Sequence, residues 1–82
     1  MTRGMRHVTV YTREQCHLCE IALEQVGTIA GEAGATWSAV DVDADPDERA
    51  EYGDRVPVIL VDGVEHGYYQ VEPERLRRAL RA

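Results

Sequence analysis

The feature that most restricts the fold of this chain is a strand pattern followed by a helical pattern and then by a second strand pattern. Residues 7–12 are β-branched or aromatic at nearly every position, as in a short buried strand. From Cys19 to Ala33, apolar residues return at intervals of three and four, which predicts one continuous helical stripe. Residues 36–42 predict the second strand. Two strands joined through a helix are expected to lie parallel, with a right-handed crossover.

A short helix is predicted next. Asp45 is expected to be its N-cap and Pro46 its first helical residue, with Glu48 reaching back as in a capping box. Gly53 is a plausible C-cap, which limits the helix to roughly two turns. The segment therefore adds a second, smaller helix after the second strand.

The last third of the chain predicts a hairpin and a final helix. Residues 55–61 form the most apolar stretch, and Asp62-Gly63 is a strong signal for a two-residue turn into a return strand over 64–69. Residues 73–82 then predict a helix with acidic residues near its start and arginines toward its end. The whole chain, 1–82, is thus expected to be one α/β domain with a mixed four-stranded sheet and three flanking helices in the order βαβαββα.

Both cysteines of the chain, Cys16 and Cys19, lie where the first strand gives way to the first helix. Unpaired backbone N–H groups and the positive end of the helix dipole favour a thiolate at such a position. We therefore expect Cys16, the outer cysteine, to attack a substrate and Cys19, one turn inward, to resolve the mixed disulfide. His17 either adds to this effect when protonated or is simply exposed, and Leu18 is expected to be an apolar rim for a docking partner.

Two further positions each allow two interpretations. Arg13 either pairs with an anionic group of a substrate or is a solvated loop arginine, and its chemistry alone favours the second. The proline of Val56-Pro57 most often just starts an edge strand, because it cannot donate to a sheet ladder. Alternatively the Val56-Pro57 bond is cis and directs the Val56 backbone toward the cysteine pair, ready to bond an extended substrate segment.

Charge and hydropathy narrow the functional classes. The net charge is −6 and no basic stripe is present, which argues against nucleic-acid binding. No apolar stretch is long enough for a signal peptide or a membrane span, so a cytoplasmic location is expected. A monomer is the default expectation for the oligomeric state. In that reducing compartment, a close cysteine pair favours catalytic, redox-sensing or metal-binding roles over a structural disulfide.

Metal or iron–sulfur binding is the alternative to redox chemistry at the cysteine pair. Two thiolates only half fill a tetrahedral site, so zinc would need His17, His66 or a second chain as well. His7 and His66 are nevertheless expected to be strand residues with ordinary partners rather than ligands. A third hypothesis is an interaction domain with inert cysteines, which suits Cys19 better than Cys16.

The element order, with a cysteine pair at the first strand-to-helix turn, resembles the thioredoxin fold. The segments 11–19 and 55–57 are similar to glutaredoxin motifs, and from His7 to Leu80 the chain resembles a small glutaredoxin-like protein of the bacterial group with a Cys-His-Leu-Cys motif. This resemblance implies a thiol–disulfide oxidoreductase that acts on protein or low-molecular-weight disulfides. It further implies that Cys16 is the nucleophile and Cys19 the resolving cysteine, that Pro57 is a cis-proline facing them, and that Arg13 contacts a glutathione carboxylate.

The chain also departs from the glutaredoxin pattern in two places. His17-Leu18 stands where glutathione-binding members usually have Pro-Tyr, and Gly67-Tyr68 stands where they have Gly-Gly. The bulk of Tyr68 or Tyr69 is expected to occupy the groove. No bound cofactor is expected, and glutathione, another low-molecular-weight thiol or a thioredoxin-type reductase would supply the electrons.

Overall fold

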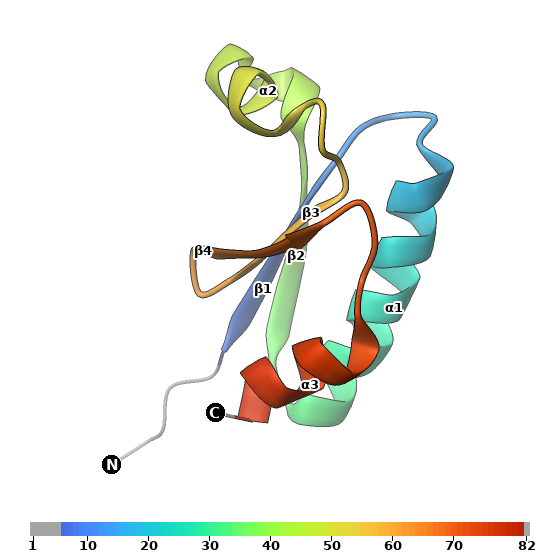
Figure 1. Ribbon diagram of the computed structural model, residues 1–82, viewed down its shortest axis with the longest axis vertical. Coiled ribbons are helices and arrows are strands. Elements are labelled where there is room, and N and C mark those ends of the chain that lie inside the picture. The colour runs from blue at the N-terminus through green and yellow to red at the C-terminus, as the bar shows by residue number, and fades with distance from the viewer. Residues whose placement is uncertain (1–5, 82) are drawn as a thin grey trace.

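The computed structural model describes residues 6–81, which build a four-stranded mixed sheet with helices around it (Figure 1). The elements are β1 (His7–Thr12), α1 (His17–Ala33), β2 (Thr36–Asp41), the 3-10 turn η1 (Val42–Ala44), α2 (Pro46–Tyr52), β3 (Val58–Val61), β4 (Val64–Tyr68) and α3 (Pro73–Arg81). The strand order across the sheet is β2-β1-β3-β4. Strand β1 runs parallel to β2, and β4 runs antiparallel to β3, as the sequence predicted. Strand β1 also pairs with β3, in the antiparallel sense.

The short helix α2 begins as predicted, with one correction. The Asp45 carboxylate accepts hydrogen bonds from the N–H groups of Asp47 and Glu48, at 2.8 and 3.4 Å. In the predicted capping box, the Glu48 carboxylate would accept a hydrogen bond from the Asp45 N–H. In the structure, the Asp45 N–H donates to the Val42 carbonyl of η1 instead. The Glu48 carboxylate accepts a hydrogen bond from the Tyr11 hydroxyl at 3.1 Å, which ties α2 to β1.

The second strand is one residue shorter than predicted. The Asp41 carboxylate accepts a hydrogen bond from the Asp43 N–H at 2.9 Å, and this side-chain cap turns the chain into η1 at Val42. Side chains of this kind compete with a sheet ladder for backbone groups. The strand therefore ends at Asp41.

The third strand starts later than predicted, at Val58 rather than at Arg55. The carbonyls of Arg55 and Pro57 both accept from the Tyr69 N–H, at 3.3 and 2.8 Å, outside the regular ladder. Strand β4 ends at Tyr68 because Tyr69 has a left-handed backbone, with φ 70°. The two strands are joined by Asp62 and Gly63, whose φ angles of 53° and 83° are those of the predicted hairpin turn.

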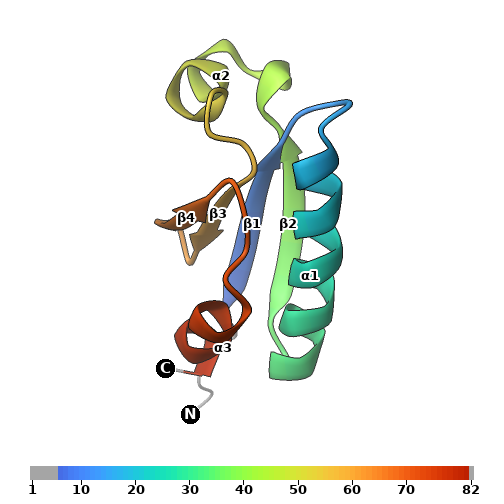
Figure 2. The same ribbon diagram turned by 45° about the vertical axis from the view of Figure 1, so that its right-hand side comes forward.

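Helices α1 and α3 pack against the same face of the sheet and against each other (Figure 2). The buried cluster between them consists of Val8, Val10, Ala22, Val26, Ile29, Ile59, Val61, Val71, Leu76 and Leu80. Helix α2 buries none of its residues and lies beyond the end of the sheet, beside the loop that follows β1 (Figures 1 and 2). Ala82, which the prediction placed in the last helix, lies outside the described residues. Every helix within residues 6–81 is too short or too polar to cross a lipid bilayer.

Candidate active site

The two cysteines lie at the start of α1 and are bonded as a disulfide, with their Cα atoms 5.2 Å apart. Cys16 is the N-cap of the helix, and its Sγ accepts a hydrogen bond from the Cys19 N–H at 3.2 Å. Cys19 is only 2% exposed, whereas Cys16 is half-buried. The sequence prediction that Cys16 lies outside and Cys19 lies inside is confirmed for their positions in the structure.

The segment Val56-Pro57 lies at the same end of the sheet as the cysteine loop. Val58 is opposite Tyr11 in the antiparallel register of β3 and β1, so the residues just before Val58 lie next to the end of β1. The Val56–Pro57 peptide bond is cis, and Pro57 is fully buried. Within residues 6–81, the backbone N–H and C=O of Val56 have no hydrogen-bond partner. The structure therefore contains the cis bond that the second interpretation of Val56-Pro57 predicted.

Arg13 lies in the loop between β1 and Cys16, and its guanidinium is held by two other segments. Its Nε and Nη2 donate to the two carboxylate oxygens of Asp43 at 3.0 and 3.1 Å, and its Nη1 donates to the Gly53 carbonyl at 3.3 Å. The hydrogen bonds from Arg13 hold the pKa of Asp43 below its usual range, and in turn raise the pKa of Arg13. Arg13 is thus neither a freely solvated arginine nor a cation without a counter-charge.

The exposed face of α1 next to the cysteines combines apolar and acidic side chains. His17 is 83% exposed, and its Nδ1 lies 3.8 Å from the Glu20 carboxylate. Leu18 is 49% exposed, and Ile21, one turn further along the same face, is 41% exposed. The sequence prediction of an apolar rim names Leu18 but not Ile21, although the position of Ile21 outside the buried stripe indicates an exposed residue.

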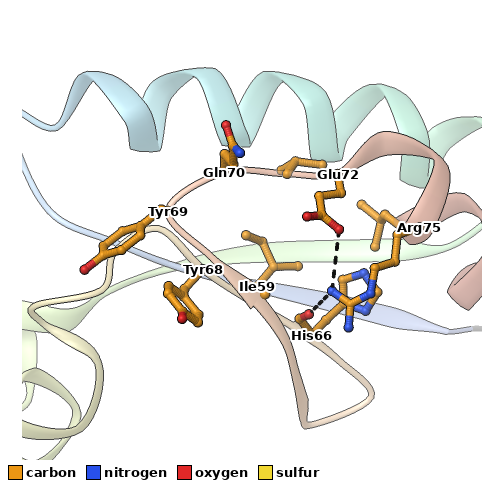
Figure 3. Close-up of a pocket in the computed structure, with 10 residues that line it drawn as sticks. Ile59, His66, Tyr68, Tyr69, Gln70, Glu72 and Arg75 are labelled. Carbon is orange, nitrogen blue, oxygen red and sulfur yellow. Dashed lines mark hydrogen bonds and ion pairs between the residues drawn. The ribbon is translucent and has the colours of Figure 1, made fainter.

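A cavity of about 420 Å³ lies between the end of β4 and the start of α3 (Figure 3). Figure 3 shows Tyr68 and Tyr69 at one end of it and Glu72 and Arg75 at the other. The Tyr69 hydroxyl donates to the Asp54 carbonyl at 3.3 Å, and its ring packs edge-on against that of Tyr68, with centroids 4.9 Å apart. Tyr69 therefore folds over the segment that precedes the cis-proline.

The two histidines in strands, His7 and His66, differ in the hydrogen bonds that their rings make. The His7 ring contacts the hydroxyls of Thr36 and Ser38 at 2.7 and 2.9 Å, as expected of a strand residue with ordinary partners. His66 also lies in a strand, β4, but the prediction of an ordinary partner is wrong for it, because its buried Nε2 has no hydrogen-bond partner among the described residues. Burial lowers the pKa of His66, and the nearby Arg75 guanidinium lowers it further. Across residues 6–81, no group of three or more His, Cys, Asp or Glu side chains is arranged to hold a metal ion.

The pairing of Arg13 with Asp43 is the contact near the cysteine loop that the sequence prediction does not contain. The two residues are separated by 30 positions, and nothing in the local pattern around either of them indicates the other. The parallel register of β1 and β2 explains the pairing, because it sets Thr12 opposite Asp41 and so brings the residues after both strands to one end of the sheet.

Comparison with solved structures shows where this architecture occurs. Protein Ne2328 from Nitrosomonas europaea superposes with a TM-score of 0.83 at 24% identity, covering 98% of this chain and 96% of that one. Protein XcR50 from X. campestris gives 0.71 at 36% identity, over 90% and 95% of the two chains. The thioredoxin of Fasciola hepatica gives 0.63 at 22% identity, over 96% and 81%. The predicted thioredoxin-like fold is confirmed.

Sequence comparison gives the family. Uncharacterized proteins Rv0508 of Mycobacterium tuberculosis and Mb0520 of Mycobacterium bovis are each 41% identical over 75 residues, which cover 85% of this chain and 77% of the relative. A family model described as Glutaredoxin-like domain (DUF836) matches residues 7–81. The chain therefore belongs to this glutaredoxin-like family of thioredoxin-fold proteins.

Proposed function

We propose that this protein is a thiol–disulfide oxidoreductase that cycles Cys16 and Cys19 between the dithiol and the disulfide, with no bound cofactor. The observation that carries the proposal is the placement of Cys16 as the N-cap of α1, where the Cys19 N–H donates to its sulfur at 3.2 Å. A hydrogen bond from a helix N-terminus stabilises a thiolate more than a thiol. Membership of the glutaredoxin-like family and the thioredoxin-like fold support the same chemistry.

Substrate reduction proceeds by two exchanges. The Cys16 thiolate attacks one sulfur of the substrate disulfide, the substrate S–S bond breaks, and the departing thiolate takes up a proton. Cys19 then loses its proton and attacks the Cys16 sulfur, which releases the second substrate thiol and forms the Cys16–Cys19 disulfide. Two electrons pass from the protein to the substrate. A low-molecular-weight thiol or a dithiol reductase returns them, as a reducing compartment such as the cytoplasm would allow.

The surroundings of Cys16 suit a substrate that arrives as an extended segment. The N–H and C=O of Val56, which have no hydrogen-bond partner among the described residues, can pair with a substrate backbone in the manner of an added strand. Leu18 presents apolar surface beside the sulfur, and His17 is exposed between the two cysteines. We assign these residues, together with Pro57, to substrate binding.

Single cysteine variants test the assignment. With dithiothreitol as electron donor, the wild-type protein is expected to reduce a disulfide-linked peptide, and Cys16→Ser is expected to abolish that activity. In a single-turnover reaction without dithiothreitol, which would itself cleave the mixed disulfide, reduced Cys19→Ser is expected to stop after the first exchange, so that intact-mass measurement finds the peptide joined to Cys16. The proposal fails if Cys16→Ser reduces the peptide at the wild-type rate, or if no mixed disulfide forms in Cys19→Ser.

A further inference from the structure

We propose that Asp43 determines the substrate class of the Cys16–Cys19 site. By holding Arg13 it neutralises the arginine of the active-site loop, and the site therefore prefers neutral or cationic disulfides to anionic ones. This inference deepens the proposed function, and its statement about substrates rests on that function. Its statement about charge concerns only how fast a charged reagent reaches the Cys16 sulfur. It makes Asp43 a specificity-determining residue that does not itself touch the reacting sulfurs.

The geometry around Arg13 is that of a built clamp. Both oxygens of Asp43 accept from Arg13, the two-pronged arrangement that gives arginine–carboxylate pairs their specificity. Asp43 is itself fixed, because its N–H donates to the Asp41 carboxylate at 2.9 Å, and Arg49 lies 3.9 Å from one of its oxygens. The third bond of Arg13, to the Gly53 carbonyl at 3.3 Å, holds the guanidinium over the end of α2.

Two acidic side chains lie close to Cys16 in the chain. Glu14 and Glu20 are both exposed, the first in the loop before the cysteine and the second in the first turn of α1. The half-exposed Leu18 and Ile21 add apolar surface beside them. Because like charges slow the approach of two molecules, an anionic disulfide or thiol reagent should reach Cys16 more slowly than a neutral one. The net charge of −6 acts in the same direction.

Removing the Asp43 carboxylate leaves Arg13 as an uncompensated cation in the loop before Cys16. One such charge is expected to raise the rate with a singly charged anionic reagent by roughly two- to sixfold. Reaction with a neutral reagent should not change. The ratio of anionic to neutral rates therefore isolates the electrostatic effect from any change in the intrinsic reactivity of Cys16.

Alkylation of the reduced protein is the direct test, because it needs no turnover. Iodoacetate is the anionic probe and iodoacetamide the neutral one, and Cys16 modification is measured by peptide mass. Asp43→Ala is expected to raise the iodoacetate-to-iodoacetamide ratio about two- to sixfold, with an effect that fades at high salt. Asp43→Asn, which keeps the side-chain shape, should move the ratio in the same direction even if the alanine variant folds poorly.

Glu32→Gln is the matched control. It removes one carboxylate that is paired with an arginine, since Glu32 lies 3.3 Å from Arg77, but it does so near the other end of α1. Its ratio is expected to equal that of the wild type. An unchanged ratio in both Asp43 variants, or an equal rise in Glu32→Gln, would overturn the inference.

The substrate class is measured with three small disulfides and dithiothreitol as reductant: cystamine as the cationic one, hydroxyethyl disulfide as the neutral one and glutathione disulfide as the anionic one. We expect wild-type kcat/KM to be lowest for glutathione disulfide, and Asp43→Ala to raise it relative to hydroxyethyl disulfide. A wild-type preference for glutathione disulfide overturns the inference. A protein that reduces none of the three, but still shows the alkylation shift, refutes the proposed function while retaining the role of Asp43 in the field at Cys16.

Discussion

Glycine is expected to be required at position 53 because the neighbouring atoms leave no room for a side chain, and not because its backbone conformation is unusual. Its angles, φ −59° and ψ −29°, are right-handed helical, and on helix propensity alone alanine would be about 0.5–1 kcal/mol more stable here. However, a Cβ at this position would lie 2.5 Å from the Arg49 carbonyl oxygen and 3.2 Å from Nη2 of Arg13. Gly53→Ala therefore forces either the end of α2 or the Arg13 side chain to move.

The two effects of Gly53→Ala oppose each other, and the steric one is larger. Inserting a methyl group into a packed position costs about 1–3 kcal/mol. Displacing Arg13 weakens its hydrogen bond to the Gly53 carbonyl, which adds about 0.5–1 kcal/mol. After the gain in helix propensity, the free energy of unfolding is expected to fall by roughly 1–3 kcal/mol.

Gly31→Ala is the matched control, because Gly31 lies inside α1 and a Cβ there would meet nothing within 4 Å. It is expected to raise the free energy of unfolding by about 0.5–1 kcal/mol through propensity alone. Urea unfolding followed by far-ultraviolet circular dichroism measures both variants. With a slope near 1 kcal/mol per molar urea, their midpoints should separate by roughly 1.5–4 M. A Gly53→Ala protein as stable as the wild type would refute the steric argument.

Three further predictions concern the core, a helix cap and pH. Leu76→Ala removes a fully buried side chain and should lower the free energy of unfolding by about 2–5 kcal/mol, whereas Arg78→Ala on the exposed side of α3 should leave it nearly unchanged in the same urea experiment. Asp45→Ala removes the N-cap of α2 and should cost about 1 kcal/mol, and a loss near zero would show that the cap adds no stability. Because the folded pKa of His66 is lowered, the unfolded chain takes up a proton first as the pH falls below about 6.5. The free energy of unfolding is therefore unaffected by the protonation of His66 above that pH and decreases as the pH falls toward the lower pKa of the folded protein. His66→Gln should remove this part of the pH dependence of stability. An identical pH profile in the variant would contradict the prediction.

Most of the fold could be predicted from local patterns. The alternation of strand and helix periods, the Asp45-Pro46 helix start and the Asp62-Gly63 turn are each decided by residues only a few positions apart. These features depend on backbone propensity and side-chain capping, which act over one or two turns of chain. The differences from the prediction, by contrast, lie at segment ends, where a side-chain cap or a partner from elsewhere in the molecule takes a backbone group or a side chain. The Glu48 carboxylate accepts a hydrogen bond from the Tyr11 hydroxyl rather than from an N–H of its own helix. The Tyr69 N–H donates to carbonyls of the segment before β3.

The sequence by itself determined that a cysteine pair stands at the first turn of a helix after a strand. The periodicity of α1 places Cys19 on the buried stripe, and Cys16 lies just before that stripe begins. Only the tertiary structure decided what surrounds the pair. The parallel register of β1 and β2 carries Asp43 to Arg13 across 30 residues, and the antiparallel register of β1 and β3 brings Val56 to the same end of the sheet. Such contacts depend on which strands become neighbours and in what register, and that is set by burial of the whole core rather than by any local stretch of the chain.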